Sequence, residues 1–554
     1  MTRLPVLLSQ IAILVTASLF IFVTPLDTYY FHPDELMHLD IADAGSLTEV
    51  LERSGRELHP PGSHIIRHIV TSGSNEVIIQ RLFSIIPGII SVVLAFILGL
   101  MGRNLISAAS LASLQLLTPF CVTYSFSIRN YAIFQSCLYA LSVSLLMLSD
   151  RSSPRRISIF VAIAILCCSL HYSGYLFVGC SILALLIHSF VVQGKNLRIS
   201  VTRHITWFAL FVAVALLIPL SLISSESMIW GWIDYLYNNS SSSAFSVAPD
   251  VRSLWRVLLS VFKGFFAVSE SLASILIVLT CLGLLASIRR KSIWGIFPAT
   301  IFTAQLILYF LGLYPLTGSR YNTWIFIPIG MSLLNLTHEF SLRLPDRLQV
   351  PISSAICVLS FIIAHHVSAI DIFFYRNYET PITRRSWDDF LKSLGTDIPE
   401  SSPVITNKVG GLYLNHQFFP GETRYSKQPL IRKTYGKHLV YFQSENFRWD
   451  YQDWRDLGLV IQNLAIKEPS QEIWFMVIAL TDFSMSSLYN CAHRFGLIQS
   501  DLSPKSKEYL LFSLSYGDLS EPLSENSPLN KACFQHSRIP HLAQLMKEWQ
   551  EIDL

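Results

Sequence analysis

Apolar runs of about twenty residues recur through the first two thirds of the chain, and they constrain its fold more than any other feature. Such a run is long enough for a helix to cross the hydrocarbon core of a bilayer. The runs occupy residues 4–26, 82–101, 105–122, 131–149, 157–171, 173–193, 204–223, 270–288, 294–314, 322–338 and 351–370. Because a membrane-spanning helix satisfies all of its own backbone groups, the pattern predicts an α-helical polytopic membrane protein with about eleven transmembrane helices.

The charge content supports a membrane protein and argues against a nucleic-acid-binding one. Only 14% of the 554 residues are charged, whereas soluble domains carry about a quarter. The net charge is +3, and the sequence has no basic tract and no zinc-finger spacing. We therefore expect the lipid bilayer, and no nucleic acid, as a partner.

Two segments depart from the simple pattern of single spans. Residues 157–193 are too long for one crossing, and His171 with Gly174 predicts a break between two helices. Residues 254–268 are apolar but include Arg256 and Lys263, so we interpret them as an interfacial or re-entrant helix.

Cations gather in alternate short turns, which predicts the orientation of the helices. The cation-rich turns contain Arg103; Arg151, Arg155 and Arg156; Lys195, Arg198 and Arg203; Arg289, Arg290 and Lys291; and Arg343 and Arg347. The opposite turns hold mainly Arg129 and Arg320. By the positive-inside rule, residues 27–81 and the C-terminal region lie outside the cytoplasm, and the first run is a retained helix.

The composition changes at about residue 371, where polar and charged residues return. Short β-type runs (SPVITN, KHLVYF, EIWFMVIAL, EYLLFSLS) alternate with helical patterns (SWDDFLKSLG, DWRDLGLVIQNLAI). We therefore predict a transmembrane domain over residues 1–370 and an extracytoplasmic α/β domain over 371–554. Seven cysteines lie in apolar runs and are expected to pack as small apolar side chains, whereas Cys491 and Cys533 either pair as a disulfide or stay free.

The loop of residues 27–81 collects acidic and basic side chains beside the first span. FHPDELMHLD, residues 31–40, contains Asp34 and Glu35 side by side. Later in the loop, Glu57 and His59 precede two prolines that fix the local backbone. Because carboxylates, histidines and arginines meet there at the predicted bilayer surface, we interpret 27–81 as a catalytic loop and not as a mere connector.

Several motifs together resemble a known family. Asp34-Glu35, His59-Pro60-Pro61 and RLFSIIPGIISVVLAFILGL from Arg81 are similar to those of GT-C fold glycosyltransferases that use polyprenyl-phosphate sugars. The group includes bacterial protein O-mannosyltransferases, lipid A aminoarabinose transferases and rhizobial galacturonosyltransferases. LTPFCVTYSFSIRNYAIF, LHYSGYLFV and LTGSRYNTWIFIPIGMSLL continue the resemblance, which covers residues 1–340.

The resemblance implies transfer of a hexosyl or pentosyl group from a polyprenyl-phosphate-linked donor to a hydroxyl of a glycan, lipid or protein acceptor. The site would lie at the outer face of the cell (inner) membrane, and the anomeric configuration would invert. Asp34 would be the base, Glu35 would support it, and Arg129 and Arg320 would bind the lipid phosphate. The further substrate-binding candidates are Glu57, His59, Arg81, Tyr131 and Tyr321.

One departure from the family concerns a possible metal. Family members often carry a glutamate two residues before the arginine at position 129, where this chain has Ser127. The residues therefore indicate no certain cofactor, and a divalent cation is a possibility in which Glu57 or Asp40 would take the place of the missing carboxylate.

Other interpretations of the same residues remain open at this point. Arg129 and Arg320 can instead reach lipid headgroups as anchors, Tyr131 and Tyr321 can belong to an aromatic belt, and Glu35 can orient a neighbouring helix. A transporter or flippase of lipid-linked sugars is the alternative function, although it predicts charges buried at mid-span and repeated halves. A scaffold would leave the loop 27–81 unexplained.

Overall fold

A computed structural model shows a chain made of two compact units. It describes residues 3–23, 33–54, 60–71, 77–102, 104–151, 153–193, 251–289, 291–311, 314, 316, 322–341, 344–366, 388, 391–392, 398, 402–406, 414, 430–435, 438–443, 473–478, 497–503 and 509–516. Met1–Asp27 and Ile41–Asn377 form the helical unit, and Thr28–Asp40 and Tyr378–Leu554 form the sheet unit.

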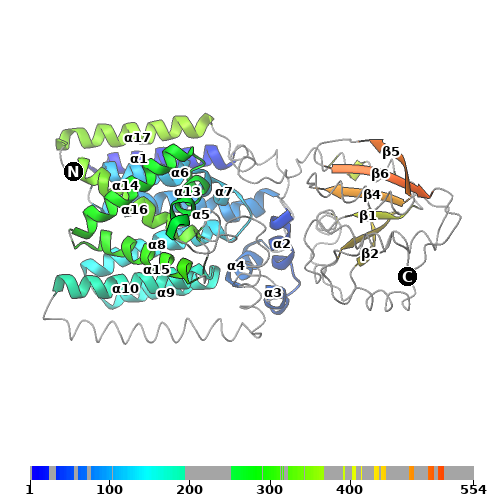
Figure 1. Cartoon of the computed structure of the whole chain (residues 1–554), viewed down its shortest axis with the longest axis horizontal. Helices are drawn as coiled ribbons and strands as arrows, with labels where there is room; N and C mark the ends of the chain where they lie inside the picture. Colours follow the sequence, from blue (N-terminus) through cyan, green and yellow to red (C-terminus); the bar gives the residue numbers. More distant parts are fainter. Residues whose placement is uncertain are drawn as a thin grey trace. The chain divides into compact units, whose positions relative to one another are not determined.

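The helical unit is a bundle in which long helices run side by side (Figure 1). Its described helices are α1 (Arg3–Val23), α3 (Leu47–Ser54), α4 (Gly62–Thr71), α5 (Val77–Met101), α6 (Leu105–Leu117), α7 (Pro119–Phe126), α8 (Tyr131–Asp150), α9 (Pro154–Leu170), α10 (Ser173–Gln193), α13 (Val251–Phe266), α14 (Glu270–Arg289), α15 (Ile293–Phe310), α16 (Thr323–Ser341) and α17 (Asp346–His366). α2 (Pro33–Ala42) begins in the sheet unit and ends in the helical unit.

The predicted polytopic helical fold is confirmed. Ten of the eleven predicted runs are helical, and the remaining run, 204–223, lies outside the described residues. Among the described helices, seven are long and apolar enough to cross a membrane, namely α1, α5, α8, α10, α14, α15 and α17. The predicted break is also present, because α9 ends at Leu170 and α10 begins at Ser173. The total of eleven spans stays a prediction.

The run 105–122, expected as one helix, is two. α6 and α7 meet at an angle of 61° on either side of Thr118, whose backbone is extended. Pro119 is the first residue of α7, where its missing N–H costs nothing, and it forces the preceding residue out of the helical region. Counted as one broken span, the pair raises the number of candidate spans to eight.

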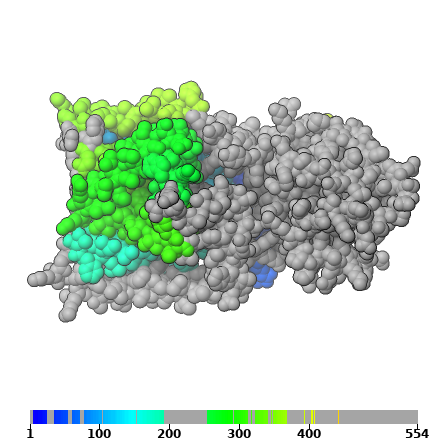
Figure 2. Space-filling view, viewed as in Figure 1, coloured from blue at the N-terminus to red at the C-terminus, as the bar shows by residue number. Residues whose placement is uncertain are grey.

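Close helix packing in the bundle depends on small residues. A Cβ at Gly88 of α5 would lie 2.5 Å from the Cβ of Ser125 in α7, and one at Gly283 of α14 would overlap the carbonyl oxygen of Ser332 in α16. Small residues allow helix backbones to approach closely in membranes. Figure 2 shows one face of the bundle, where the green residues of the later helices cover much of the surface and α10 (cyan) runs along its edge.

The sheet unit contains a six-stranded mixed sheet with the order β2-β3-β1-β4-β6-β5. The strands are β1 (Val404–Thr406), β2 (Leu430–Tyr435), β3 (His438–Gln443), β4 (Ile473–Ile478), β5 (Leu497–Ser503) and β6 (Tyr509–Tyr516). β1 is parallel to β3 and β4, whereas β2 and β6 pair antiparallel with β3 and β4. The four predicted β runs coincide with β1, β3, β4 and β6. The two predicted helices lie mostly outside the described residues, as do Cys491 and Cys533.

Candidate functional site

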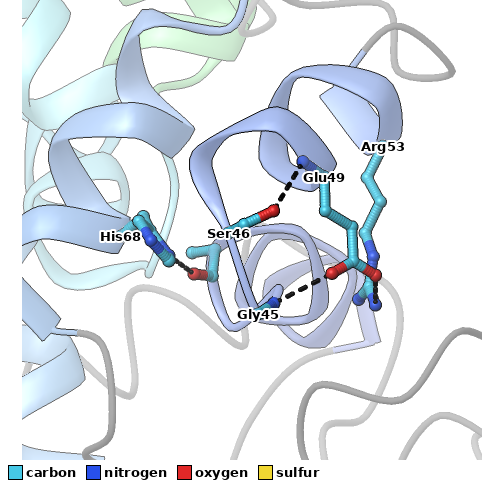
Figure 3. Close-up of polar contacts among 6 residues, drawn as sticks. Gly45, Ser46, Glu49, Arg53 and His68 are labelled. Atoms are coloured by element: carbon cyan, nitrogen blue, oxygen red, sulfur yellow. Dashed lines mark hydrogen bonds and ion pairs between the residues drawn. The ribbon is translucent and has the colours of Figure 1, made fainter.

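The loop before α5 folds into short helices, and the first turn of α3 is closed by a reciprocal cap (Figure 3). Ser46 Oγ accepts the backbone N–H of Glu49 at 3.3 Å, and the Glu49 carboxylate accepts the N–H of Gly45 at 3.0 Å. Arg53 donates to the same carboxylate at 2.6 Å, and this hydrogen bond lowers the pKa of Glu49. A cap of this kind fixes the start of α3.

α4 holds the C-terminal end of α2. Nδ1 of His68 lies 2.7 Å from the carbonyl oxygen of Ala42, the last residue of α2 (Figure 3). Beside this contact, Ile41 packs in a small apolar cluster with Val50 and Ile65. The end of a helix leaves carbonyl groups that need partners, and a histidine nearby can supply one. The described parts of the loop are therefore folded, and its catalytic role stays a prediction.

The two predicted catalytic carboxylates lie in the first turn of α2. Asp34 and Glu35 follow Pro33, which is suited to the first position of a helix. Glu35 is fully buried, whereas the side chain of Asp34 lies outside the described residues.

Two arginines of the helical unit are buried against aromatic rings. Arg81, near the start of α5, is fully buried with its guanidinium carbon 4.4 Å from the centre of the Phe126 ring. Its Nη1 donates to the carbonyl oxygen of Phe126 at 3.1 Å. Arg67 of α4, also buried, stacks at 4.3 Å over Phe83. Stacking on a ring satisfies one face of a guanidinium and leaves its edge available for hydrogen bonds.

Arg129 lies in the turn between α7 and α8, and neighbouring helices hold that turn. The N–H of Arg129 donates to the carbonyl of Ser127 at 2.8 Å, and Nδ2 of Asn130 donates to the carbonyl of Leu170 at 2.8 Å. Ser84 of α5 donates to the carbonyl of Arg129 at 3.5 Å. We call this turn, residues 127–130, together with the adjoining ends of α7 and α8, the Arg129 end.

The burial of Arg129 bears on whether this residue is a headgroup anchor or a ligand-binding cation. A snorkelling anchor extends its charge to the lipid headgroups and stays exposed. Arg129 is instead only 8% exposed. Enclosing a guanidinium in protein costs several kcal/mol unless it is well partnered, so anchoring alone does not account for this residue.

Unpartnered polar atoms surround the turn. The hydroxyl oxygens of Thr123, Ser125 and Ser127 and Oδ1 of Asn130 are buried and have no hydrogen-bond partner among the described residues. Thr123 and Ser127 are four residues apart and share one face of α7 and its end. Because a buried polar group without a partner costs about 1–3 kcal/mol, such atoms normally meet water or a ligand.

Tyr131, another predicted substrate-binding residue, lies within an aromatic cluster and not at a lipid-facing belt. It is fully buried, with its ring 4.7 Å from that of Tyr124 and 5.6 Å from that of His171. Nδ1 of His171 accepts the backbone N–H of Ser173 at 3.1 Å, so the ring proton of a neutral His171 lies on Nε2. His171 therefore makes a local hydrogen bond at the start of α10.

α4 contributes residues that the sequence reasoning did not assign to the site. His64, Arg67 and Thr71 are buried, whereas Ile69 and Val70 are 67% and 63% exposed. Polar residues face inward and apolar residues outward, which is the arrangement expected of a helix that faces lipid. The spacing of His64, Arg67 and Thr71, at three and four residues, is the signal that would have found this face.

Four predicted site residues, Glu57, His59, Arg320 and Tyr321, lie outside the described residues. Asn322 and Trp324, which follow Tyr321 at the start of α16, are fully buried. In the part of the chain that the structure describes, no three His, Cys, Asp or Glu side chains form a group that could hold a metal ion. Because Glu57 and His59 are not among these residues, a divalent cation stays a prediction.

Comparison with known proteins places the fold. No family model matches the sequence, and no curated protein matches it. Among solved structures, ArnT from Cupriavidus metallidurans bound to undecaprenyl phosphate superposes with a TM-score of 0.50, 10% identity, and coverage of 91% of this chain and 97% of that one. The oligosaccharyltransferase of Archaeoglobus fulgidus, in a complex with Zn and sulfate, superposes with a TM-score of 0.50 and 12% identity. That match covers 94% of this chain and 74% of the oligosaccharyltransferase.

The chain has the GT-C fold. Both neighbours are membrane glycosyltransferases of this fold, and the apo form of the same ArnT gives the same TM-score at 11% identity. The resemblance deduced from the motifs is thus confirmed at the level of the fold. At 10–12% identity the similarity concerns the arrangement of the helices, and the roles of individual residues must be argued from their own surroundings.

Proposed function

We propose that the chain is an integral membrane glycosyltransferase that moves a sugar from a polyprenyl-phosphate donor to a hydroxyl acceptor at the outer face of the membrane. The observation that carries this proposal is the burial of two arginines in a GT-C fold: Arg129 in the turn after α7, and Arg81 of α5 against Phe126 at the end of α7. One neighbour of that fold, ArnT, was solved with undecaprenyl phosphate, which supports a lipid phosphate as the carrier.

A phosphate group explains the cost of burying these cations. A guanidinium matches a phosphate with two parallel N–H donors, and such charge-assisted hydrogen bonds are about twice as strong as neutral ones. Arg81 is held by Phe126, and the neighbouring Arg129 turn is held by Ser84 and Asn130. Preorganised donors of this kind stabilise the charge that develops on a departing phosphate at little reorganisation cost. Ser127 would add a hydroxyl donor beside them.

The proposed reaction is a single displacement at the anomeric carbon. The acceptor oxygen forms a bond to that carbon while the bond from the carbon to the phosphate oxygen breaks. The electron pair of the broken bond leaves with the polyprenyl phosphate, and Asp34 takes the proton of the acceptor hydroxyl. Because the attack comes from the face opposite the phosphate, the anomeric configuration inverts.

The remaining predicted residues have supporting roles in this proposal. Glu35 orients Asp34 or the acceptor, and its full burial agrees with a positioning role. Glu57, His59, Arg320 and Tyr321 complete the contacts to substrate, and a divalent cation would require Glu57 or Asp40 as ligands. The acceptor belongs to the glycan, lipid or protein class, and the sugar is a hexosyl or pentosyl group.

The transporter alternative predicts charges in the middle of membrane helices. In the described spans α5, α8 and α14, the charged residues lie near the ends, as with Arg81, Asp150 and Arg289. Described spans α10 and α15 contain no Asp, Glu, Lys or Arg. The absence of mid-span charge in these described helices argues against transport through the bundle.

The proposal is tested by incubating the purified chain with a set of radiolabelled polyprenyl-phosphate sugars and analysing the products. Asp34→Asn keeps the shape of the side chain and removes the base, so we expect transfer to fall at least a hundredfold. Glu35→Gln should reduce transfer less. Binding of the donor should survive in Asp34→Asn, because the arginines hold the phosphate.

Glu52→Gln is the matched control, because Glu52 is an exposed carboxylate in α3 of the same loop. It should transfer sugar at the wild-type rate. A folded Asp34→Asn protein with a rate close to wild type would exclude Asp34 as the base. Failure of every donor to react with the wild-type chain would contradict the glycosyltransferase proposal itself.

A further inference from the structure

α13 has two chemically different faces. Leu259, Phe262 and Phe265 are buried and recur at a spacing of three residues. The opposite face exposes a polar stripe, which we name the basic stripe and which consists of Arg256, Ser260 and Lys263. Trp255, next to Arg256 in the first half of the helix, is also exposed. The members of the basic stripe are four and three residues apart, so they project from one side of the helix.

The buried face of α13 places this helix beside the Arg129 end. The ring of Phe265 lies 4.6 Å from that of Phe120 in α7 and 5.9 Å from that of Phe326 in α16. Phe120 contacts Tyr124 at 4.8 Å, and Tyr124 contacts Tyr131 at 4.7 Å. A continuous row of rings therefore joins α13 to the first residue of α8.

The connection to α14 fixes the depth of α13. Only residues 267–269 separate Phe266 from Glu270, where the candidate span α14 begins. Ala267 has a positive φ of 51°, so the chain turns sharply there. α13 itself has 16 residues and two exposed cations, which is too short and too charged for a span. Its C-terminal end consequently lies at the level where α14 leaves the hydrocarbon core.

We propose that the basic stripe of α13 binds the anionic headgroup of a bilayer phospholipid. Arg256 and Lys263 lie about 10 Å apart along the helix, and neither makes an ion pair with any residue that the structure describes. Basic residues at the edge of the hydrocarbon core are attracted to anionic lipid headgroups. Trp255, 46% exposed, adds the amphipathic ring that prefers this depth.

The exposure of the stripe identifies a bulk lipid as the ligand. The donor phosphate of the proposed reaction requires buried, fixed cations such as Arg81, which is fully enclosed. Arg256 and Lys263 are exposed on flexible side chains, and such cations suit a headgroup that exchanges with the surrounding bilayer. A bound lipid layer would hold α13 against Phe120 and Phe326, and thereby support the Arg129 end from outside. This inference does not depend on the proposed reaction.

Quenching of Trp255 fluorescence by brominated lipids tests the inference. The full chain is reconstituted in phosphatidylcholine vesicles that contain a minority of phosphatidylglycerol, with bromine on either one lipid or the other. The contribution of Trp255 is the difference between the wild type and Trp255→Phe. We expect quenching by brominated phosphatidylglycerol to exceed that by brominated phosphatidylcholine about twofold at equal content, and the excess to decline with salt.

The variant Arg256→Gln/Lys263→Gln should lose this excess while quenching by phosphatidylcholine is retained. Arg151→Gln/Arg155→Gln removes the same charge from exposed positions at the α8–α9 turn and should keep the excess. Equal quenching by the two lipids in the wild type would overturn the proposal, and so would an equal loss in both variants. Recovery of the fluorescence by undecaprenyl phosphate, but not by excess unlabelled phosphatidylglycerol, would assign the stripe to the donor instead.

Discussion

Two groups of cations in the helical unit differ completely in their surroundings. Arg67, Arg81 and Arg129 are between 0% and 8% exposed and are fixed by rings or by a clamped turn. Arg256 and Lys263 of the basic stripe are exposed. The first group is expensive to bury and so must have partners of opposite charge or polarity, whereas the second is held at no such cost.

The two kinds of surroundings suit the cations to different roles. A cation that is enclosed and oriented can stabilise a charge that develops during a reaction. A cation that moves freely at the bilayer surface can attract lipids and orient a helix, but it offers no fixed geometry. Burial, and not the type or number of the cations, therefore distinguishes the site from its surroundings.

The largest effect on stability should follow loss of a buried cation. Arg81→Ala removes the stack on Phe126 and the hydrogen bond to its carbonyl, and it leaves a cavity under the Arg129 turn. We expect a loss of about 3 kcal/mol in the free energy of unfolding, measured by thermal unfolding in detergent. Arg151→Ala, at an exposed position, is the control. Equal stability of the two variants would remove the distinction between the groups.

A smaller loss of stability should follow from a substitution that pushes α5 and α7 apart. A Cβ at Gly88 would lie 2.5 Å from the Cβ of Ser125, so Gly88→Ala must displace the helix that leads into the Arg129 turn. The expected loss is about 1–3 kcal/mol, with reduced sugar transfer. Gly179→Ala in α10 meets nothing within 4 Å and should be tolerated. Similar melting temperatures for the two variants would show that this contact does not position the turn.

The smallest effect should come from the basic stripe. Arg256→Gln/Lys263→Gln changes only exposed side chains, so unfolding in detergent without added lipid should shift by less than about 0.5 kcal/mol. With phosphatidylglycerol present, the wild type should gain stability that the variant does not. A large loss in pure detergent would show that the two cations have structural partners within the protein.

The sheet shows how far sequence patterns predict structure. The predicted strands β1, β3, β4 and β6 are the four interior strands, and the unpredicted β2 and β5 are the two edges. Interior strands need apolar residues on both faces, as in IWFMVI of β4, whereas edge strands tolerate charge, as with Arg432 and Lys433 of β2. The apolar signal is therefore weakest where a strand has only one neighbour.

The candidate site was predicted less completely, for a similar reason. Arg81, Arg129 and Tyr131 were named through the resemblance to the GT-C family, but a residue at a helix end can face lipid or protein with the same sequence pattern. His64 and Arg67 were not assigned, although their spacing with Thr71 marks one face of α4. The bend at Pro119 has a recognisable local cause, whereas the clamp on the Arg129 turn depends on residues that are distant in the sequence, such as Ser84 and Leu170.

In the proposed reaction, buried cations at the Arg129 end hold a lipid phosphate while a separate carboxylate acts on the acceptor. Arg129→Gln keeps a polar side chain, although a shorter one, and removes the charge, so it tests the contribution of the guanidinium to phosphate binding. Arg155→Gln removes an exposed arginine and is the control.

The direct measurement is the dissociation constant for undecaprenyl phosphate of the purified chain and its folded variants. We predict that Arg129→Gln raises this constant at least tenfold, as expected for the loss of a charge-assisted hydrogen bond. Asp34→Asn and Arg155→Gln should bind as the wild type does. Unchanged binding by a folded Arg129→Gln protein, in an assay that detects binding by the wild type, would show that Arg129 does not hold the lipid phosphate.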